Sequence, residues 1–116
     1  VYILDFEVTH VGNPVFDVAF LLAHLLCKFY RTDVEIEAKL LKACAQQYVA
    51  EYSILRPISP TFGLHTALIA LARVEGKSPV NYLDSNKQNL LVAHTKRILG
   101  AGIQVGIDDL FMKVLP

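Results

Sequence analysis

The chain has 116 residues, of which 53% are hydrophobic and 19% charged, and 11 basic and 11 acidic residues give a formal net charge of zero. This length suits one domain around one core, and the balanced charge excludes the basic stripe of a nucleic-acid-binding protein. The most apolar run, residues 15–30, contains Asp17, His24 and Lys28 and is too short to span a bilayer, so we expect no membrane partner.

The first residues predict the end of a β-strand. Residues 1–4 are all apolar and include β-branched and aromatic side chains, whereas residues 5–13 read as a loop that ends in the turn signal Gly12-Asn13-Pro14. A strand this short needs a neighbouring strand. We therefore expect the chain to be the C-terminal helical part of something larger.

The rest of the chain predicts helices, at about 15–30, 34–53, 61–75, 85–99 and 107–115. The first and third are apolar on nearly every side and should be buried, and Asp33 should cap the second. The second helix should be amphipathic and lie on the outside, with Glu35 and Lys39 paired on its outer face. Its core-facing stripe is predicted to be Ile36, Leu40, Cys44, Tyr48 and Tyr52. The predicted fold class is mainly α, a helical bundle in a single domain, residues 1–116, with a short N-terminal strand remnant.

Two carboxylates follow the predicted strand. Asp5 and Glu7 are two residues apart, so an extended backbone points both the same way. Such a pair repels unless a cation lies between them, and Mg²⁺ prefers carboxylate oxygens. The alternative is a strand that ends in solvent with two hydrated acids.

Asp17 and Arg73 are candidates for structural roles. Asp17 either complements the positive end of its helix or is buried and accepts backbone N–H groups from the preceding loop, and the apolar neighbours favour burial. Arg73 lies in a helix predicted to be buried, so it needs a partner, which could be Asp17 or a helix C-terminus.

The remaining candidates have ordinary explanations. Both cysteines lie among apolar residues and read as buried thiols without a disulfide, which favours a reducing, cytoplasmic location. His10 is interpreted as a solvated loop residue that could also face metal or phosphate. His24 and His65 are interpreted as core residues and His94 as a surface residue. Lys77 is interpreted as a solvated loop lysine.

Residues 2–26, YILDFEVTHVGNPVFDVAFLLAHLL, resemble the segment that ends the active site in aminoglycoside phosphotransferase-like and choline kinase-like enzymes. The Asp5-Phe6-Glu7 sequence is more similar to choline and methylthioribose kinases. Residues 71–83, LARVEGKSPVNYL, also look like a stretch of bacterial members of this protein-kinase-like superfamily.

The resemblance implies a fold and a parent function. The fold would be the helical C-lobe of such a kinase. Asp5 would bind Mg²⁺ on the phosphates of ATP, Glu7 would assist or contact the metal through water, and Asp17 would brace the loop. The substrate of the parent would be a small-molecule alcohol, phosphorylated on its hydroxyl.

The sequence departs from this family in a way that affects activity. It contains neither the His-Gly-Asp catalytic loop nor the nucleotide-binding lobe with its lysine. Phosphoryl transfer depends on positioning and charge stabilisation by these parts, so we expect no kinase activity from this chain alone. The alternative is a non-enzymatic helical remnant that forms a homodimer by pairing the strand edge at residues 1–4.

Overall fold

A computed structural model describes residues 11–76, 79–101 and 104–113, and these residues form five helices. They are α1 (Val15–Arg31), α2 (Glu35–Leu55), α3 (Phe62–Glu75), α4 (Ser85–Ala101) and α5 (Ile107–Leu110). The predicted mainly α class is confirmed, and the four long helices lie within two residues of their predicted bounds. No strand occurs within the described ranges, and the predicted strand at residues 1–4 lies outside them.

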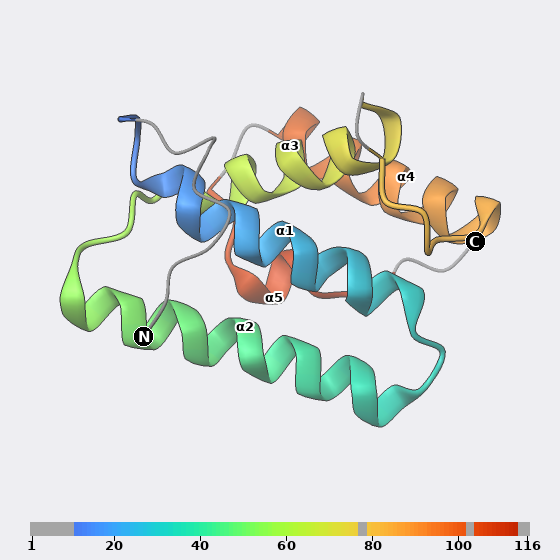
Figure 1. The fold of residues 1–116 in the computed structure, drawn as a ribbon, viewed down its shortest axis with the longest axis horizontal. Helices are drawn as coiled ribbons and strands as arrows, with labels where there is room; N and C mark the ends of the chain where they lie inside the picture. The colour runs from blue at the N-terminus through green and yellow to red at the C-terminus, as the bar shows by residue number, and fades with distance from the viewer. Residues whose placement is uncertain (1–10, 77–78, 102–103, 114–116) are drawn as a thin grey trace.

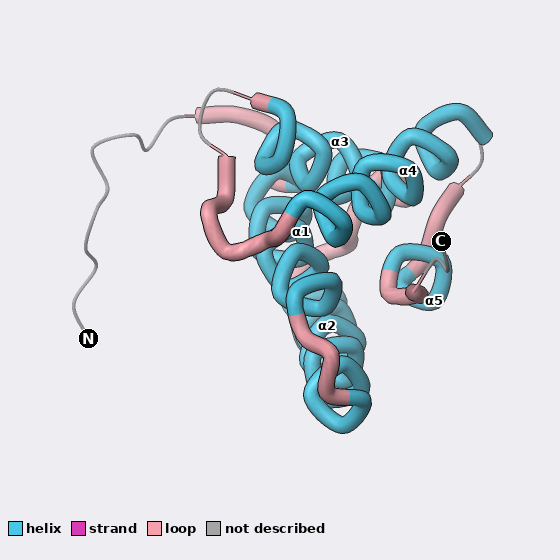
Figure 2. Tube along the Cα trace, turned by 90° about the vertical axis from the view of Figure 1, so that its right-hand side faces the viewer, coloured by secondary structure: helices cyan, strands magenta, loops and turns pink. Residues whose placement is uncertain are grey.

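Helix α1 is the centre of the arrangement. It packs against α3, α2 and α4, with α3 and α4 on one side and α2 on the other (Figure 1). Figure 2 shows α2 on the side of α1 that lies away from α3 and α4. The buried face of α1 supplies much of the core, with Val18, Leu22, Ala23, Leu26, Cys27, Phe29 and Tyr30. The prediction that α1 is buried on nearly every side is wrong in part, because Phe16, Phe20 and Leu21 are exposed.

The start of α1 follows from the turn signal in the sequence. Pro14 already has helical dihedral angles, φ −56° and ψ −23°. The Asn13 side-chain oxygen accepts the Val15 N–H at 3.0 Å, and the Asn13 carbonyl accepts the Phe16 N–H at 3.0 Å. Asn13 therefore caps the helix and Pro14 occupies its first position, where a missing N–H costs nothing.

Helix α2 is amphipathic, but three of the five residues of its predicted core-facing stripe are exposed. Ile36 and Leu40 are 61% and 58% exposed, and Cys44 is exposed, whereas Tyr48 and Tyr52 pack against the core. Each four-residue step turns about 40° beyond a full helical turn, so a stripe at that spacing drifts across the helix over five residues. The residues that face the core are Ala38, Leu41, Ala45, Tyr48, Val49 and Tyr52.

Small residues bring α1 and α3 together. Ala19 and Ala23 on α1 are fully buried, as are Ala67 and Ala70 on α3. On α3, Gly63 lies against the backbone of Val105, and a Cβ there would be 2.1 Å from the Val105 carbonyl oxygen. The predicted burial of α3 is wrong on its outer face, where Leu68 is exposed.

The carbonyl end of α1 is held by two distant lysines. The Lys113 ammonium donates to the carbonyls of Phe29 and Thr32, and the Lys87 ammonium donates to the Arg31 carbonyl. Both satisfy carbonyls that lack partners within the helix and complement its negative end.

The predicted Asp33 cap of α2 is wrong, because the Asp33 carboxylate pairs with Lys87 at 3.0 Å. Thr32 provides the hydrogen bonds at the start of α2 instead. Its hydroxyl accepts a hydrogen bond from the Val34 N–H and donates one to the Glu37 carboxylate. The predicted Glu35–Lys39 ion pair is confirmed at 3.2 Å.

The last helix is shorter than predicted. Helix α5 ends at Leu110 instead of continuing to residue 115. The chain leaves the helix at Phe111, whose ring is 2% exposed and meets Phe29 edge-on at 5.4 Å. Burying this ring outweighs the few backbone hydrogen bonds of another helical turn. None of the described helices is long and apolar enough to cross a membrane.

Candidate functional site

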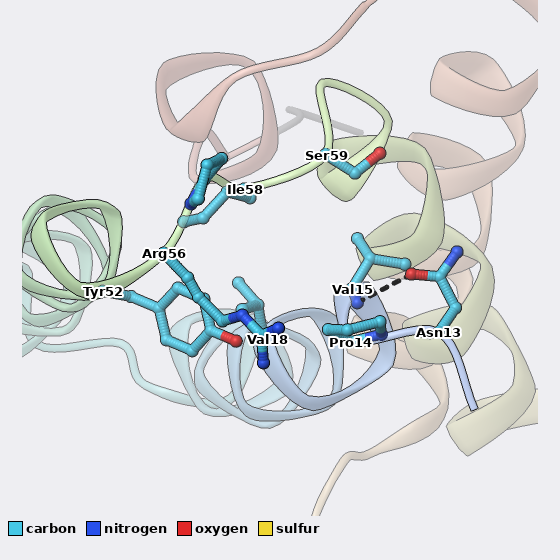
Figure 3. Close-up of a pocket in the computed structure, with 9 residues that line it drawn as sticks. Asn13, Pro14, Val15, Val18, Tyr52, Arg56, Ile58 and Ser59 are labelled. Carbon is cyan, nitrogen blue, oxygen red and sulfur yellow. Dashed lines mark hydrogen bonds between the residues drawn. The ribbon is translucent and has the colours of Figure 1, made fainter. Parts of the chain in front are cut away.

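A cavity of about 290 Å³ opens at the start of α1. Its walls are the first turn of α1, the last turn of α2 and the loop that leads to α3. In Figure 3 the side chains of Tyr52 and Arg56 point from the end of α2 towards the start of α1. The lining residues are Asn13, Pro14, Val15, Val18, Tyr52, Arg56, Pro57, Ile58 and Ser59.

The polar groups of the cavity are mainly hydrogen-bond donors. Arg56 is exposed and contributes a permanent cation, which takes no part in the ion pairs found among the described residues. The positive end of α1 adds to this field. The Ser59 hydroxyl forms a hydrogen bond with the Thr61 hydroxyl at 2.8 Å. This bond fixes the loop opposite Asn13. The cavity therefore suits a small polar molecule that carries oxygen acceptors.

Asp17 does not have the predicted environment. It is exposed, so the prediction of burial is wrong. Its carboxylate lies near Tyr48, whose pKa is raised by burial, then by Tyr52 and then by Asp17. Asp17 thus adds a negative charge at the α1–α2 side of the site. Its role in bracing the preceding loop stays a prediction.

Within the described ranges, Arg73 forms no ion pair with a carboxylate. The predicted Asp17–Arg73 pair is not among the ion pairs of the described residues, and Glu75 pairs with Lys96 at 3.4 Å. The Arg73 side chain is half-buried, and its Nε–H is buried without an acceptor. Its structural role stays a prediction, and its charge is unbalanced.

The predicted metal ligands, Asp5 and Glu7, lie outside the described residues, as do His10 and Lys77. Within the described ranges, no group of three or more histidine, cysteine, aspartate and glutamate side chains could hold a metal ion.

Two of the described histidines, His24 and His65, are half-buried. His24 is half-buried, and its pKa is lowered by burial first and then by Arg73 and Lys28. His65 is also half-buried, and its Nδ1 lies 2.9 Å from the Thr61 carbonyl.

The prediction that His94 is a surface residue is wrong, because its side chain is completely buried. Its Nε2 is 2.9 Å from the Leu110 carbonyl, which can only accept, so Nε2 carries the proton. Its Nδ1 then accepts from Arg97 at 2.9 Å. Leu91, Thr95 and Ile98 line the same buried stripe of α4, so helical spacing could have placed His94 inside.

The two cysteines differ in solvent exposure. Both are free, but Cys27 is buried whereas Cys44 is exposed, so the prediction of burial is wrong for Cys44. Burial raises the pKa of Cys27 to about 11, although Arg73 opposes this shift. Cys27 is therefore a neutral thiol at physiological pH.

Comparisons with protein-family models, with curated proteins and with solved structures found no match for this chain.

Sequence reasoning missed Tyr52 and Arg56 as residues of the cavity. The sequence predicted that the second helix ends near residue 53, and α2 ends at Leu55. It could not indicate that the end of α2 returns to the start of α1, because that depends on how the two helices pack.

Proposed function

We propose that this chain carries the metal-binding segment and the helical lobe of an ATP-dependent phosphotransferase that phosphorylates a hydroxyl of a small molecule. The observation that carries the proposal is the sequence Asp5-Phe6-Glu7, followed by Gly12-Asn13-Pro14 and Phe16-Asp17. Its resemblance to the family of aminoglycoside, choline and methylthioribose kinases extends over residues 2–26.

The short stretch of chain between the two acids and the cavity permits this assignment. Glu7 is four residues from Val11, so the backbone allows at most about 14 Å between their Cα atoms. Asn13, only two residues further on, lines the cavity and caps α1. A metal held by Asp5 and Glu7 would thus lie within reach of a substrate in this cavity.

The chemistry of the two acids fits Mg²⁺, which takes one or two carboxylates together with phosphate oxygens and water. When bound, Mg²⁺ neutralises charge on the transferred phosphate. The Arg56 guanidinium supplies a second positive charge at the cavity. Its geometry suits orientation of an oxygen-bearing substrate beside the metal.

We further propose that the chain alone does not catalyse the transfer. Its sequence lacks the His-Gly-Asp loop that would orient the substrate hydroxyl. In this reading the chain binds Mg²⁺ and contributes part of the substrate surface.

Calorimetric titration with Mg²⁺, without nucleotide, tests the proposal. We expect saturable binding that Asp5→Asn abolishes and Glu7→Gln weakens. Glu51→Gln is the matched control, because Glu51 is an exposed carboxylate near the end of α2. This variant should bind Mg²⁺ as the unchanged chain does. Absence of saturable binding, or equal binding by Asp5→Asn, would contradict the assignment.

A second function is favoured by the outer face of α2. Ile36, Leu40, Ile54 and Leu55 are large apolar residues and all are more than half exposed. Apolar side chains along one helix suit contact with another protein chain. In this alternative the chain is a non-enzymatic module that forms a homodimer. Sedimentation analysis tests it: a dimer that Leu40→Glu dissociates supports it, and a monomer at high concentration excludes it.

A further inference from the structure

Three basic side chains converge on Tyr82, at the end of α1 opposite the cavity. The Lys28 ammonium is 5.6 Å from the centre of the Tyr82 ring, and the Arg31 guanidinium is 5.5 Å from it. Arg73, in the last turn of α3, lies close enough to lower the Tyr82 pKa, although burial raises that pKa overall. The end of α1 and the segment before α4 lie side by side in Figure 1.

The positive charge of this cluster is not balanced within the described part of the chain. The ion pairs found there use Lys39, Lys42, Lys87 and Lys96. Three acidic residues lie near the cluster in sequence, and each has another partner. Asp33 pairs with Lys87, Glu75 pairs with Lys96, and Asp84 accepts the backbone N–H of Lys87. The cluster therefore brings three like charges together, which is unfavourable without an anion.

The end of α1 does not need these charges for its own stability. Lys87 and Lys113 already donate to the carbonyls of Phe29, Arg31 and Thr32. The side chains of Lys28 and Arg31 are exposed instead and lie over the ring of Tyr82.

Two polar atoms of the cluster lack a hydrogen-bond partner. The Arg73 Nε and the Tyr82 hydroxyl are buried, and neither forms a hydrogen bond with the residues that the structure describes. The segment that carries Tyr82 is held in place, because the Val80 N–H donates to the Arg73 carbonyl at 2.7 Å. Buried polar groups without partners are uncommon in native proteins and call for an explanation.

We propose that Lys28, Arg31, Arg73 and Tyr82 form a binding site for a small phosphate-bearing anion, of the phosphate monoester or pyrophosphate class. Three cations match a ligand with two or more negative charges, and guanidinium groups bind phosphate oxygens in pairs. The buried Cys27 thiol beside Arg73 stays neutral and does not repel such a ligand.

This site is separate from the cavity at the start of α1. Helix α1 has 17 residues and is about 25 Å long. The cluster uses its last turn, whereas Asn13 and the cavity lie at its start. The inference therefore goes beyond the proposed function and can stand or fall without it.

Titration with pyrophosphate in chloride buffer, without divalent metal, tests the site by calorimetry. We expect saturable one-to-one binding that Lys28→Gln and Arg31→Gln each weaken about tenfold or more. Both residues are exposed, so these variants should fold. The matched control is Lys39→Gln, which removes an exposed lysine from α2. No saturable binding of pyrophosphate or of phenyl phosphate, or equal weakening by Lys39→Gln, would overturn the proposal.

Two further arms sharpen the result. Tyr82→Phe keeps the ring but removes the hydroxyl, and we expect it to weaken binding several-fold. Asp5→Asn should leave pyrophosphate binding unchanged, and a loss in that variant would place the anion at the other end of α1 and overturn the proposal. A titration with phenyl phosphate in place of pyrophosphate shows which of the two ligand types binds more tightly. Saturable binding of either ligand supports the site if it depends on Lys28 and Arg31.

Discussion

The close contact between α3 and the segment before α5 gives the sharpest prediction for stability. Gly63→Ala would place a methyl group 2.1 Å from the carbonyl oxygen of Val105 and 2.8 Å from its carbonyl carbon. Favourable contacts between non-bonded carbon atoms lie at about 3.5–4.0 Å. The backbone at Val105 would have to move by more than about 1 Å, and Val105 is a buried part of the core.

Two opposing effects set the size of the change. Alanine is favoured over glycine within a helix by up to about 1 kcal/mol. Forcing an extra methyl into a packed site costs about 1–3 kcal/mol, and displacing Val105 from the core adds part of the roughly 1.5–3 kcal/mol that burial of such a side chain contributes. The cost is larger than the gain, so we expect Gly63→Ala to lower the free energy of unfolding by about 1–3 kcal/mol.

Urea unfolding followed by circular dichroism measures this difference. Gly100→Ala is the matched control, because it is also a helical glycine but nothing lies within 4 Å of its added methyl group. We expect the control to be unchanged or to be more stable by up to about 1 kcal/mol. If Gly63→Ala were as stable as Gly100→Ala, the packing of Val105 on α3 would be wrong.

Further predictions concern buried and capping groups. Burial lowers the pKa of His94, so the unfolded chain takes up a proton near its ordinary pKa of about 6.5 while the folded chain does so only at lower pH. The free energy of unfolding should therefore be constant above about pH 7 and fall below about pH 6.5, with a smaller fall in His94→Gln; urea titrations that show no fall between pH 7 and pH 5 would contradict this. Cys44 should react with a thiol reagent in the native protein and Cys27 only after unfolding, and equal native rates would be inconsistent with their burial. Lys113→Gln should lower the free energy of unfolding by about 1 kcal/mol because the α1 carbonyls lose their cation, whereas Lys39→Gln should cost at most about 0.5 kcal/mol; a reversed order in urea unfolding would refute the capping role.

Local signals in the sequence were enough to predict most of the helices. Asn13-Pro14 fixes the start of α1, and the Asp84 side chain accepts the Lys87 N–H at the start of α4, as its capping position indicates. Helix α3 ends at Glu75, as predicted, and Gly76 follows it. These features depend on residues within four positions of each other, so sequence alone reveals them.

The features that failed depend on contacts between distant segments. Phe111 ends α5 early because its ring packs on Phe29 of α1. Asp33 does not cap α2 because Lys87, 54 residues away, binds its carboxylate. The hydrogen-bond partner of the His94 ring is the Leu110 carbonyl, which comes from another segment. Hydrophobic spacing cannot specify such partners, since they follow from tertiary packing.

The cavity and the basic cluster also arise from tertiary packing. Arg56 faces the start of α1 only because α2 packs antiparallel along it in Figure 1. Arg73 reads as a structural arginine in sequence, yet it lies near Tyr82 without a carboxylate. The family resemblance, by contrast, rests on residues 2–26 and is independent of these contacts.

The most direct test of the central claim is to locate a bound metal with Mn²⁺ in place of Mg²⁺. Paramagnetic broadening of amide signals reports which residues lie near the ion. The account predicts the strongest broadening around Val11, Asn13 and Arg56 at the start of α1, and its loss in Asp5→Asn. Broadening that is uniform over the surface, or that persists in Asp5→Asn, would contradict a metal site formed by Asp5 and Glu7.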